Sequence, residues 1–139
     1  MIVIDTNVIS EPVKPLANPA VIAWLDHQPK EELYLSAPVL MEVLLGITQL
    51  PGGKRKSSMM AAVQTLLTNY FAGRFLAFER QAAAEYAVLA SRAAAKGYAI
   101  SIADCQIAAI AAIHGFAVAT RDTAPFLTVG VPVIVPWKS

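Results

Sequence analysis

The sequence predicts an α/β fold, a three-layer α/β/α sandwich built around a parallel sheet. Short apolar segments alternate with longer helical ones along the whole chain. That alternation favours parallel strands, because each needs a crossover helix and is then buried on both faces. The length of 139 residues and a hydrophobic fraction of 56% suit one core. We therefore expect a single domain over residues 1–139.

The first half of the chain carries two clear helix start signals. Asn18 precedes Pro19, which is a capping residue followed by proline at the first helical position, and Ser36 precedes Ala37 and Pro38 in a similar way. The predicted elements are a strand over 1–4, a helix over 19–24, a strand over 32–36 and a helix over 37–50.

In the second half, glycines end two helical patterns, at Gly97 and Gly115. The segment PGGKRK, residues 51–56, is predicted to be a turn with a basic tip. The predicted elements are helices over 59–71, 79–97 and 100–115, strands over 75–78, 116–120 and 131–135, and a turn over 121–126.

Composition excludes several classes of protein. The single Cys105 excludes an internal disulfide, and His27 and His114 do not form a Cys/His zinc motif. The sequence shows no secretory leader and no apolar run near the about 18 residues needed to cross a bilayer. We expect a cytoplasmic protein with no membrane partner. With only 15% charged residues, some apolar surface should remain for self-association or a partner.

Two acids follow predicted strands. Asp5 comes directly after MIVI, and Asp122 comes two residues after FAVAT. In open parallel sheets, ligands bind beyond the carboxyl ends of the strands, so both positions favour a functional site. The alternative is that each aspartate makes a local turn through its side chain.

Two further acids lie on predicted helices. Glu42 is the only charge in APVLMEVLLGI and shares a helix face with Val39 and Gly46, unless it turns outward to solvent. Asp104 has the apolar Ile107 at i+3. Asp104 also follows Ser101 by three residues, so the pair is a candidate capping box, a role compatible with binding a cation.

A doubly wound sheet could bring the four acids to one crevice. Two like charges about 4 Å apart repel by about 4 kcal/mol at an effective dielectric of about 20, so the acids must bind protons or a cation. Oxygen ligands without thiol or imidazole favour Mg²⁺ or Mn²⁺. Such a site suits phosphodiester hydrolysis. The hydroxyls of Thr6 and Thr120 are candidates to support the ligands, or are ordinary β-branched residues.

The motifs IDTNVIS, MEVLLG, ADCQIAAIA and ATRDTAPF, in this order, resemble the PIN-domain ribonucleases, specifically VapC-type toxins. The resemblance runs from Met1 to about Trp137, and SEP after DTNVI and the closing PW are most like the FitB-like branch. It implies a five-stranded parallel sheet and an Mg²⁺- or Mn²⁺-dependent ribonuclease. Many relatives carry Asn where this chain has Asp122. By position, the implied catalytic and metal residues are Asp5, Glu42, Asp104 and Asp122.

The resemblance also implies partners. VapC-type toxins form homodimers and are held inactive by a VapB/FitA-type antitoxin whose tail covers the acidic groove. Operator DNA is then bound only through the antitoxin. We expect an antitoxin arginine that competes with metal and RNA for the acids.

Basic residues are candidates for contacts with RNA. Lys54, Arg55 and Lys56 could bind its backbone, or could simply keep a turn polar. Arg121 would flank the crevice and contact phosphate, or pair with an acid. Outside the four acids, eleven bases face the six others of the ten acids, which predicts a mildly basic surface.

Two other functions remain open from the sequence. A catalytically silent PIN-fold protein would act only by binding its partner, although all four acidic positions are present here. A phosphoacceptor receiver-like module would also place acids at strand ends. Against it, the chain lacks two adjacent early acids, and Lys138 lies beyond the final strand.

Overall fold

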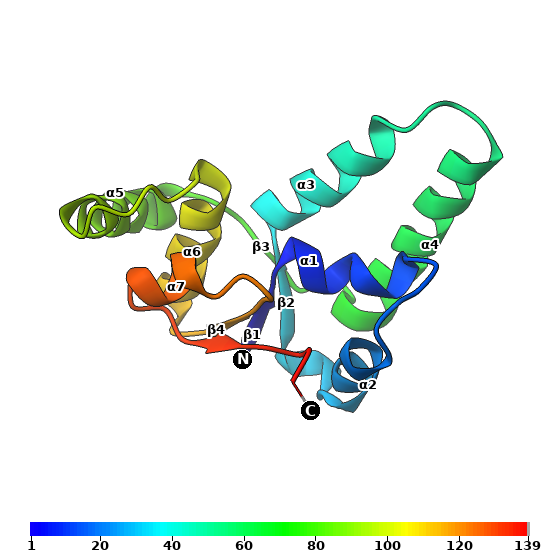
Figure 1. Ribbon diagram of the computed structural model, residues 1–139, viewed down its shortest axis with the longest axis horizontal. Coiled ribbons are helices and arrows are strands. Elements are labelled where there is room, and N and C mark those ends of the chain that lie inside the picture. Colours follow the sequence, from blue (N-terminus) through cyan, green and yellow to red (C-terminus); the bar gives the residue numbers. More distant parts are fainter. Residues whose placement is uncertain (139) are drawn as a thin grey trace.

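A five-stranded, all-parallel sheet forms the centre of the protein, as a computed structural model that describes residues 1–138 shows (Figure 1). The strand order is β3-β2-β1-β4-β5. In the central strand, Ile2 pairs with Leu33 on one side and with Ala117 on the other. The predicted five-stranded α/β sheet is confirmed. The strands are β1 Ile2–Ile4, β2 Leu33–Ser36, β3 Phe75–Leu76, β4 Ala117–Ala119 and β5 Val133–Ile134.

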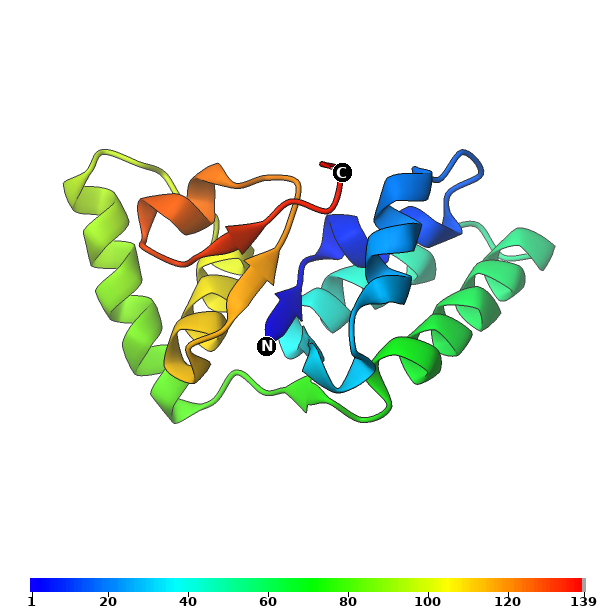
Figure 2. The same ribbon diagram turned by 90° about the horizontal axis from the view of Figure 1, so that it is seen from below.

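Helices cover both faces of the sheet. Because crossover connections between parallel strands are right-handed, the helices before β3 lie on one face and those after it on the other. Figure 2 shows this division, with α5, α6 and α7 on one side of the sheet and α1 to α4 on the opposite side. The helices are α1 Thr6–Ile9, α2 Pro19–His27, α3 Ala37–Thr48, α4 Lys54–Phe71, α5 Arg80–Ala95, α6 Ile102–His114 and α7 Ala124–Thr128, with 3-10 turns η1 Glu11–Val13 and η2 Lys30–Glu32.

Capping explains where several helices begin and end. Asn18 accepts the backbone N–H of Ala20 at 2.9 Å, as its position before Pro19 predicts. Ser101 accepts the N–H of Asp104, and Gly115 ends α6 in the left-handed region at φ 69°. Ser36 precedes α3 as predicted, but its hydroxyl makes no capping bond and is buried without a partner.

Two predicted turns are wrong in part. Helix α4 already starts at Lys54, because Gly53 at φ 138° redirects the chain just before it. Lys54, Arg55 and Lys56 therefore occupy the first helical turn rather than a loop tip. Similarly, the segment predicted as a turn over 121–126 enters α7 at Ala124, with a proline in its first turn. The short helix α1 was not predicted.

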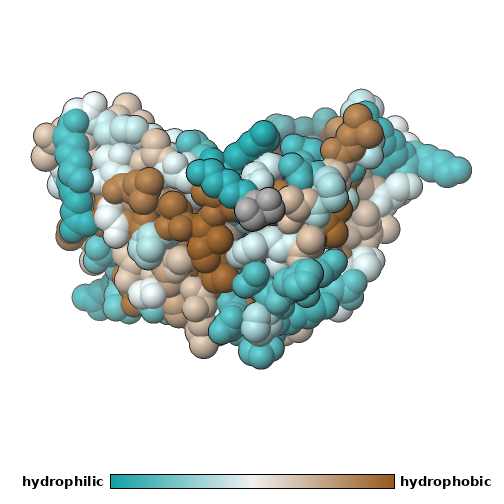
Figure 3. All heavy atoms as spheres, turned by 60° about the horizontal axis from the view of Figure 1, so that its bottom comes forward, coloured by the Kyte–Doolittle hydropathy of each residue, from teal (hydrophilic) through white to brown (hydrophobic). Residues whose placement is uncertain are grey.

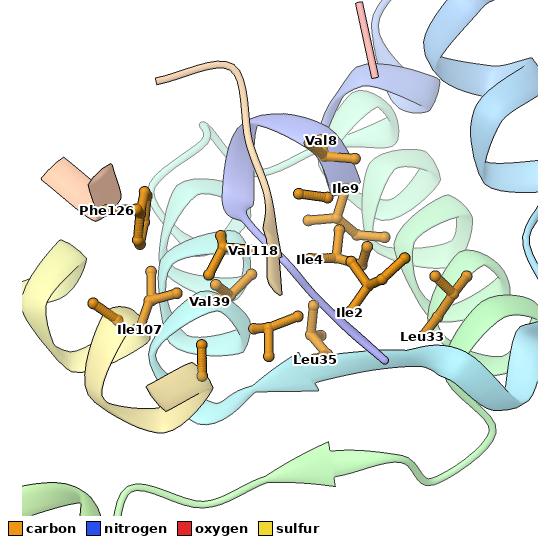
Figure 4. Close-up of a cluster of buried hydrophobic side chains, with 14 of the residues drawn as sticks. Ile2, Ile4, Val8, Ile9, Leu33, Leu35, Val39, Ile107, Val118 and Phe126 are labelled. Carbon is orange, nitrogen blue, oxygen red and sulfur yellow. The ribbon is translucent and has the colours of Figure 1, made fainter. Parts of the chain in front are cut away.

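The core is continuous across the sheet. Ile4, Leu35 and Val118 from neighbouring strands are fully buried, and Figure 4 shows them packed between Val39 and other helical side chains. Each fully buried side chain of this size contributes about 1.5–3 kcal/mol. Burial on both faces explains why β1 reads as an unbroken apolar run rather than an alternating one.

Apolar side chains also remain on the surface. Figure 3 shows brown patches that interrupt the hydrophilic surface of the face drawn. Within residues 1–138, no helix has the length and apolar character needed to cross a membrane. The predicted surplus of apolar surface is confirmed by these large exposed side chains: Met1, Leu16, Met41, Leu45, Phe75, Val88, Ile102 and Leu127.

Candidate metal centre

The site lies where the sheet reverses its winding direction. β1 and β4 are neighbours, but the chain leaves β1 for one face and β4 for the other, which opens a crevice at their carboxyl ends. The Asp5 N–H donates to the Ala119 carbonyl at 3.0 Å, so Asp5 extends the β1–β4 ladder by one residue. Asp122 follows the end of β4 at the same edge.

Asp5 is held rigidly in this crevice. The residue is only 5% exposed, and each of its carboxylate oxygens accepts a hydrogen bond. Oδ1 accepts the Thr6 N–H at 2.8 Å, which makes Asp5 the N-cap of α1, and Oδ2 accepts the Thr120 hydroxyl at 2.7 Å. The first turn of α1 and the end of β4 thus fix the orientation of this carboxylate.

The pKa of Asp5 is raised, chiefly by burial, despite the hydrogen bonds from Thr120 and Thr6 that lower it. The negative charges of Asp104 and Glu42 raise it further. Asp104 and Glu42 each lie close enough to Asp5 for their charges to act on it. Positive charge supplied at this position would relieve both the burial cost and the repulsion.

Asp104 behaves in the same way from the opposite face of the sheet. It is half-buried in the first turn of α6, and burial raises its pKa, while the hydrogen bond with Ser101 lowers it. The charge of Asp122, an exposed residue, raises the pKa of Asp104 further. Asp5 thus lies within electrostatic range of Glu42 and Asp104, and Asp104 lies within electrostatic range of Asp122.

Glu42 lies at the border of the core rather than inside it. The residue is half-buried, and on its predicted apolar face Val39 is buried but Leu45 is 52% exposed. Its Oε1 accepts the Thr6 hydroxyl at 3.0 Å. Thr6 therefore joins two acids, because its N–H bonds Asp5 and its hydroxyl bonds Glu42.

Asn7 is a residue that the sequence analysis missed. Its Nδ2 donates to the Thr120 hydroxyl oxygen at 3.4 Å, and its Oδ1 accepts the Arg121 N–H at 3.2 Å. The Thr120 oxygen also accepts the Asp122 N–H at 3.1 Å. Asn7 thereby fastens the loop that carries Asp122 to helix α1. Its place directly after Asp5 and Thr6 was the available signal.

A groove of about 420 Å³ opens beside the acids, between α1, η1, α3 and α4. Glu42 and Thr6 line it, together with the cations Lys14 and Arg55. The remaining lining is largely apolar, from Ile9, Val13, Val43, Ile47, Leu50, Met59, Val63 and Leu66.

The basic run predicted to contact RNA divides between different environments. Arg55 is exposed and lines the groove, and Lys54 is exposed to solvent. Lys56 instead donates to the Thr48 carbonyl at 2.8 Å, which satisfies a free carbonyl at the end of α3. Of these three cations, Arg55 is thus the one that lines the same groove as Glu42.

A second polar cluster, also missed from the sequence, flanks the crevice. Glu11 is only 5% exposed, its Oε2 pairs with Lys14 at 3.1 Å, and its Oε1 accepts the Asn18 N–H at 3.3 Å. Burial would raise the pKa of Glu11, but these bonds and the charges of Lys14 and Arg121 lower it overall. The Arg121 guanidinium lies over the Trp137 ring, 5.1 Å from its centroid.

The donor set has the chemistry of a hard-metal site. Asp5, Glu42, Asp104 and Asp122 supply only carboxylate oxygens, the ligands that Mg²⁺ and Mn²⁺ prefer. In residues 1–138, no three His, Cys, Asp or Glu side chains are close enough to enclose an ion as they stand. Of the four acids, only Asp5 is fixed by burial, whereas the other three are half-buried or exposed.

Comparison with known proteins agrees with this architecture. Residues 2–131 match the PIN domain family. The chain belongs to the PIN-domain family. Three full-length relatives of this PIN domain are the plasmid stability protein StbB of Pseudomonas syringae pv. tomato, 45% identical over 100% of both chains, the VapC ribonuclease Y4jK of Sinorhizobium fredii, 45% over 99% of both, and the toxin FitB of Neisseria gonorrhoeae, 44% over 99% of both.

Solved structures match the PIN domain equally closely. The FitAcB crystal structure from Neisseria gonorrhoeae contains a chain 44% identical with a TM-score of 0.94, covering 100% of both chains. FitAB bound to an IR36 DNA fragment matches with the same identity and TM-score, over 100% of this chain and 97% of that one. The receiver-like alternative loses its support, because receiver sheets have the order 2-1-3-4-5 rather than 3-2-1-4-5.

Proposed function

We propose that this PIN domain is the toxin of a type II toxin–antitoxin module and a metal-dependent endoribonuclease. The observation that carries the proposal is the buried Asp5 carboxylate, which Thr120 ties to the end of β4 and Thr6 links to Glu42. It is supported by full-length relatives named VapC ribonuclease and toxin FitB. The proposed site residues are Asp5, Glu42, Asp104 and Asp122, with Thr6 and Thr120 supporting them.

Mg²⁺ or Mn²⁺ is the proposed cofactor, held by the four carboxylates. When bound, such an ion polarises phosphoryl oxygens and lowers the pKa of water. Asp5 contributes a fixed ligand, because both of its oxygens are oriented by hydrogen bonds. Glu42, Asp104 and Asp122 are less buried than Asp5, so their side chains have room to adjust to the ion.

The chain itself supplies positioning and proton transfer. Thr6 keeps Glu42 turned toward Asp5, and Asn7 holds the loop of Asp122 against α1. We assign acceptance of the proton from the attacking water to the half-buried carboxylate of Asp104, in the first turn of α6. Hydrolysis would then break the phosphodiester bond between two nucleotides of an RNA strand.

We propose that the groove beside Glu42 receives a cognate antitoxin. The groove is lined mainly by apolar side chains, and such a surface favours an amphipathic helix that buries its apolar face. Thr6 and Glu42 line the same groove, so an arginine following that helix would reach the acids and displace a cation. Operator DNA would be bound through the antitoxin, and the toxin is expected to dimerise.

Incubation of the purified, antitoxin-free chain with total RNA tests the activity. We expect cleavage with Mg²⁺ or Mn²⁺, and none with EDTA or in Asp5→Asn and Asp104→Asn variants. Cleavage that survived EDTA or either substitution would refute the mechanism. A folded wild type that bound antitoxin but cut no RNA would instead favour the catalytically silent alternative.

A further inference from the structure

The rim of the crevice carries a cation pair that none of the four acids explains. Lys14 and Arg121 come from opposite ends of the chain, yet both charges act on the buried carboxylate of Glu11. Figure 2 shows that the segment after β5 runs from the β4 side of the sheet toward α1. The cluster is therefore a product of the fold rather than of a local motif.

Arg121 directly precedes Asp122 and is held by two contacts. Its backbone N–H donates to Asn7 at 3.2 Å, and its guanidinium lies over the Trp137 ring. Trp137 is half-buried and packs against the core, so the ring is a fixed support. Arg121 is exposed, so its guanidinium N–H groups remain available, and such groups bind phosphates and bases.

Lys14 is fixed from the other side. Its Nζ pairs with Glu11 at 3.1 Å, while the lysine side chain is 53% exposed and that of Glu11 only 7%. The single negative charge of Glu11 faces the two positive charges of Lys14 and Arg121, so this cluster carries a net positive charge. Surface pairs contribute little to stability, so stability alone does not account for burying Glu11 here.

We propose that Lys14 and Arg121 form a phosphate-binding pair that holds the RNA backbone beside the four acids, with Glu11 and Trp137 as positioning residues. The inference rests on the proposed ribonuclease function and names how its substrate is held. A polyanion drawn to a crevice of four carboxylates needs such fixed cations at the entrance, because the acids alone repel it.

Fluorescence anisotropy with a random-sequence single-stranded RNA oligonucleotide tests the pair. The chain carries Asp5→Asn to prevent cleavage, and Lys14→Gln and Arg121→Gln are added singly and together. We expect each to weaken binding about threefold to tenfold and to reduce the slope of log K against log salt by about 0.7. The matched control is Arg80→Gln, an exposed arginine beside His114 at the end of α6 opposite Asp104.

The positioning of Arg121 has its own readout. Trp137→Leu should weaken RNA binding as Arg121→Gln does, Trp137→Phe should restore it, and the two losses should not add, because both remove one contact. In the cleaving wild-type background, Arg121→Gln should raise KM and leave kcat unchanged.

Three results would overturn the inference. The first is that the Lys14 and Arg121 variants show the same RNA affinity and the same salt slope as Arg80→Gln, while the wild type still cleaves RNA. Weakened antitoxin binding with unchanged RNA binding would assign the pair to a protein partner. A wild type that neither bound nor cut RNA would remove the proposed function as well.

Discussion

The Thr120 hydroxyl donates to Oδ2 of Asp5 at 2.7 Å and so ties the end of β4 to the end of β1. Thr120→Val keeps the shape of the side chain but leaves one oxygen of a buried carboxylate without its donor. We expect a loss of about 1.5–3 kcal/mol in the free energy of unfolding, measured with urea. Thr120→Ser, which keeps the hydroxyl, should lose much less. A loss in Thr120→Ser as large as that in Thr120→Val would show that the hydroxyl bond to Asp5 is not what stabilises this position.

A divalent cation should stabilise the folded chain through the acids. Because only the folded chain brings the carboxylates together, Mg²⁺ at tenfold excess over its Kd should add about 1.4 kcal/mol to the free energy of unfolding. Asp5→Asn and Asp104→Asn should abolish this gain. Glu79→Gln, an exposed acid before α5, should keep it. An Mg²⁺ effect that was the same in all four proteins would locate the ion elsewhere.

The pKa of Glu11 predicts the pH dependence of stability. Its pKa is lowered in the folded chain from an ordinary value of 4.5, so its contribution is present above that pH and is lost as the pH falls through the folded value. The stability difference between wild type and Glu11→Gln should therefore be larger near neutral pH and shrink below about pH 4.5. For the exposed Glu31→Gln the difference should stay flat. A Glu11→Gln difference that grew on acidification would reverse the assigned shift.

Local signals explain which parts of this structure were predictable. Residues close in the sequence are enough to predict the apolar strand β1, the Asn18 cap and the end of α6 at Gly115. The acids that follow strands lie at the carboxyl edge of the sheet because the strands are parallel. The helix α1 was missed because its four residues TNVI give no helical period.

The contacts that complete the site depend on the tertiary fold. Asn7 bonds Thr120 across 113 residues, and Trp137 supports Arg121 only because the last segment returns to the crevice. Neither hydrophobic periodicity nor residue spacing predicts contacts between residues so far apart in the sequence. The sequence could name the proposed ligands and, beside them, Thr6 and Thr120, whereas the contacts of Asn7 and Trp137 emerged only from the structure.

The end of α4 offers a stability test remote from the acids. Ala72 sits in the left-handed region at φ 41°, and its N–H closes the helix on the Leu67 carbonyl. Ala72→Gly removes the steric cost of this conformation, so we expect a gain of about 0.5–1 kcal/mol, reduced by the greater freedom of glycine in the unfolded chain. Gly115→Ala, in the equivalent position after α6, should lose about 1 kcal/mol. A loss in Ala72→Gly would contradict the conformation seen.

Gly46 provides a way to fill the groove without disturbing the fold. It lies in α3 and lines the groove, and no atom lies within 4 Å of where a Cβ would stand. Gly46→Leu should therefore place a side chain in the groove and raise the free energy of unfolding by about 0.5–1 kcal/mol, because glycine is unfavourable inside a helix. RNA cleavage should continue, since the acids are untouched, but the cognate antitoxin should inhibit it at least about tenfold less well. Gly46→Ala gives nearly the same helical gain with little bulk, so it should remain inhibited. If Gly46→Leu were inhibited as strongly as Gly46→Ala, the antitoxin would bind outside this groove.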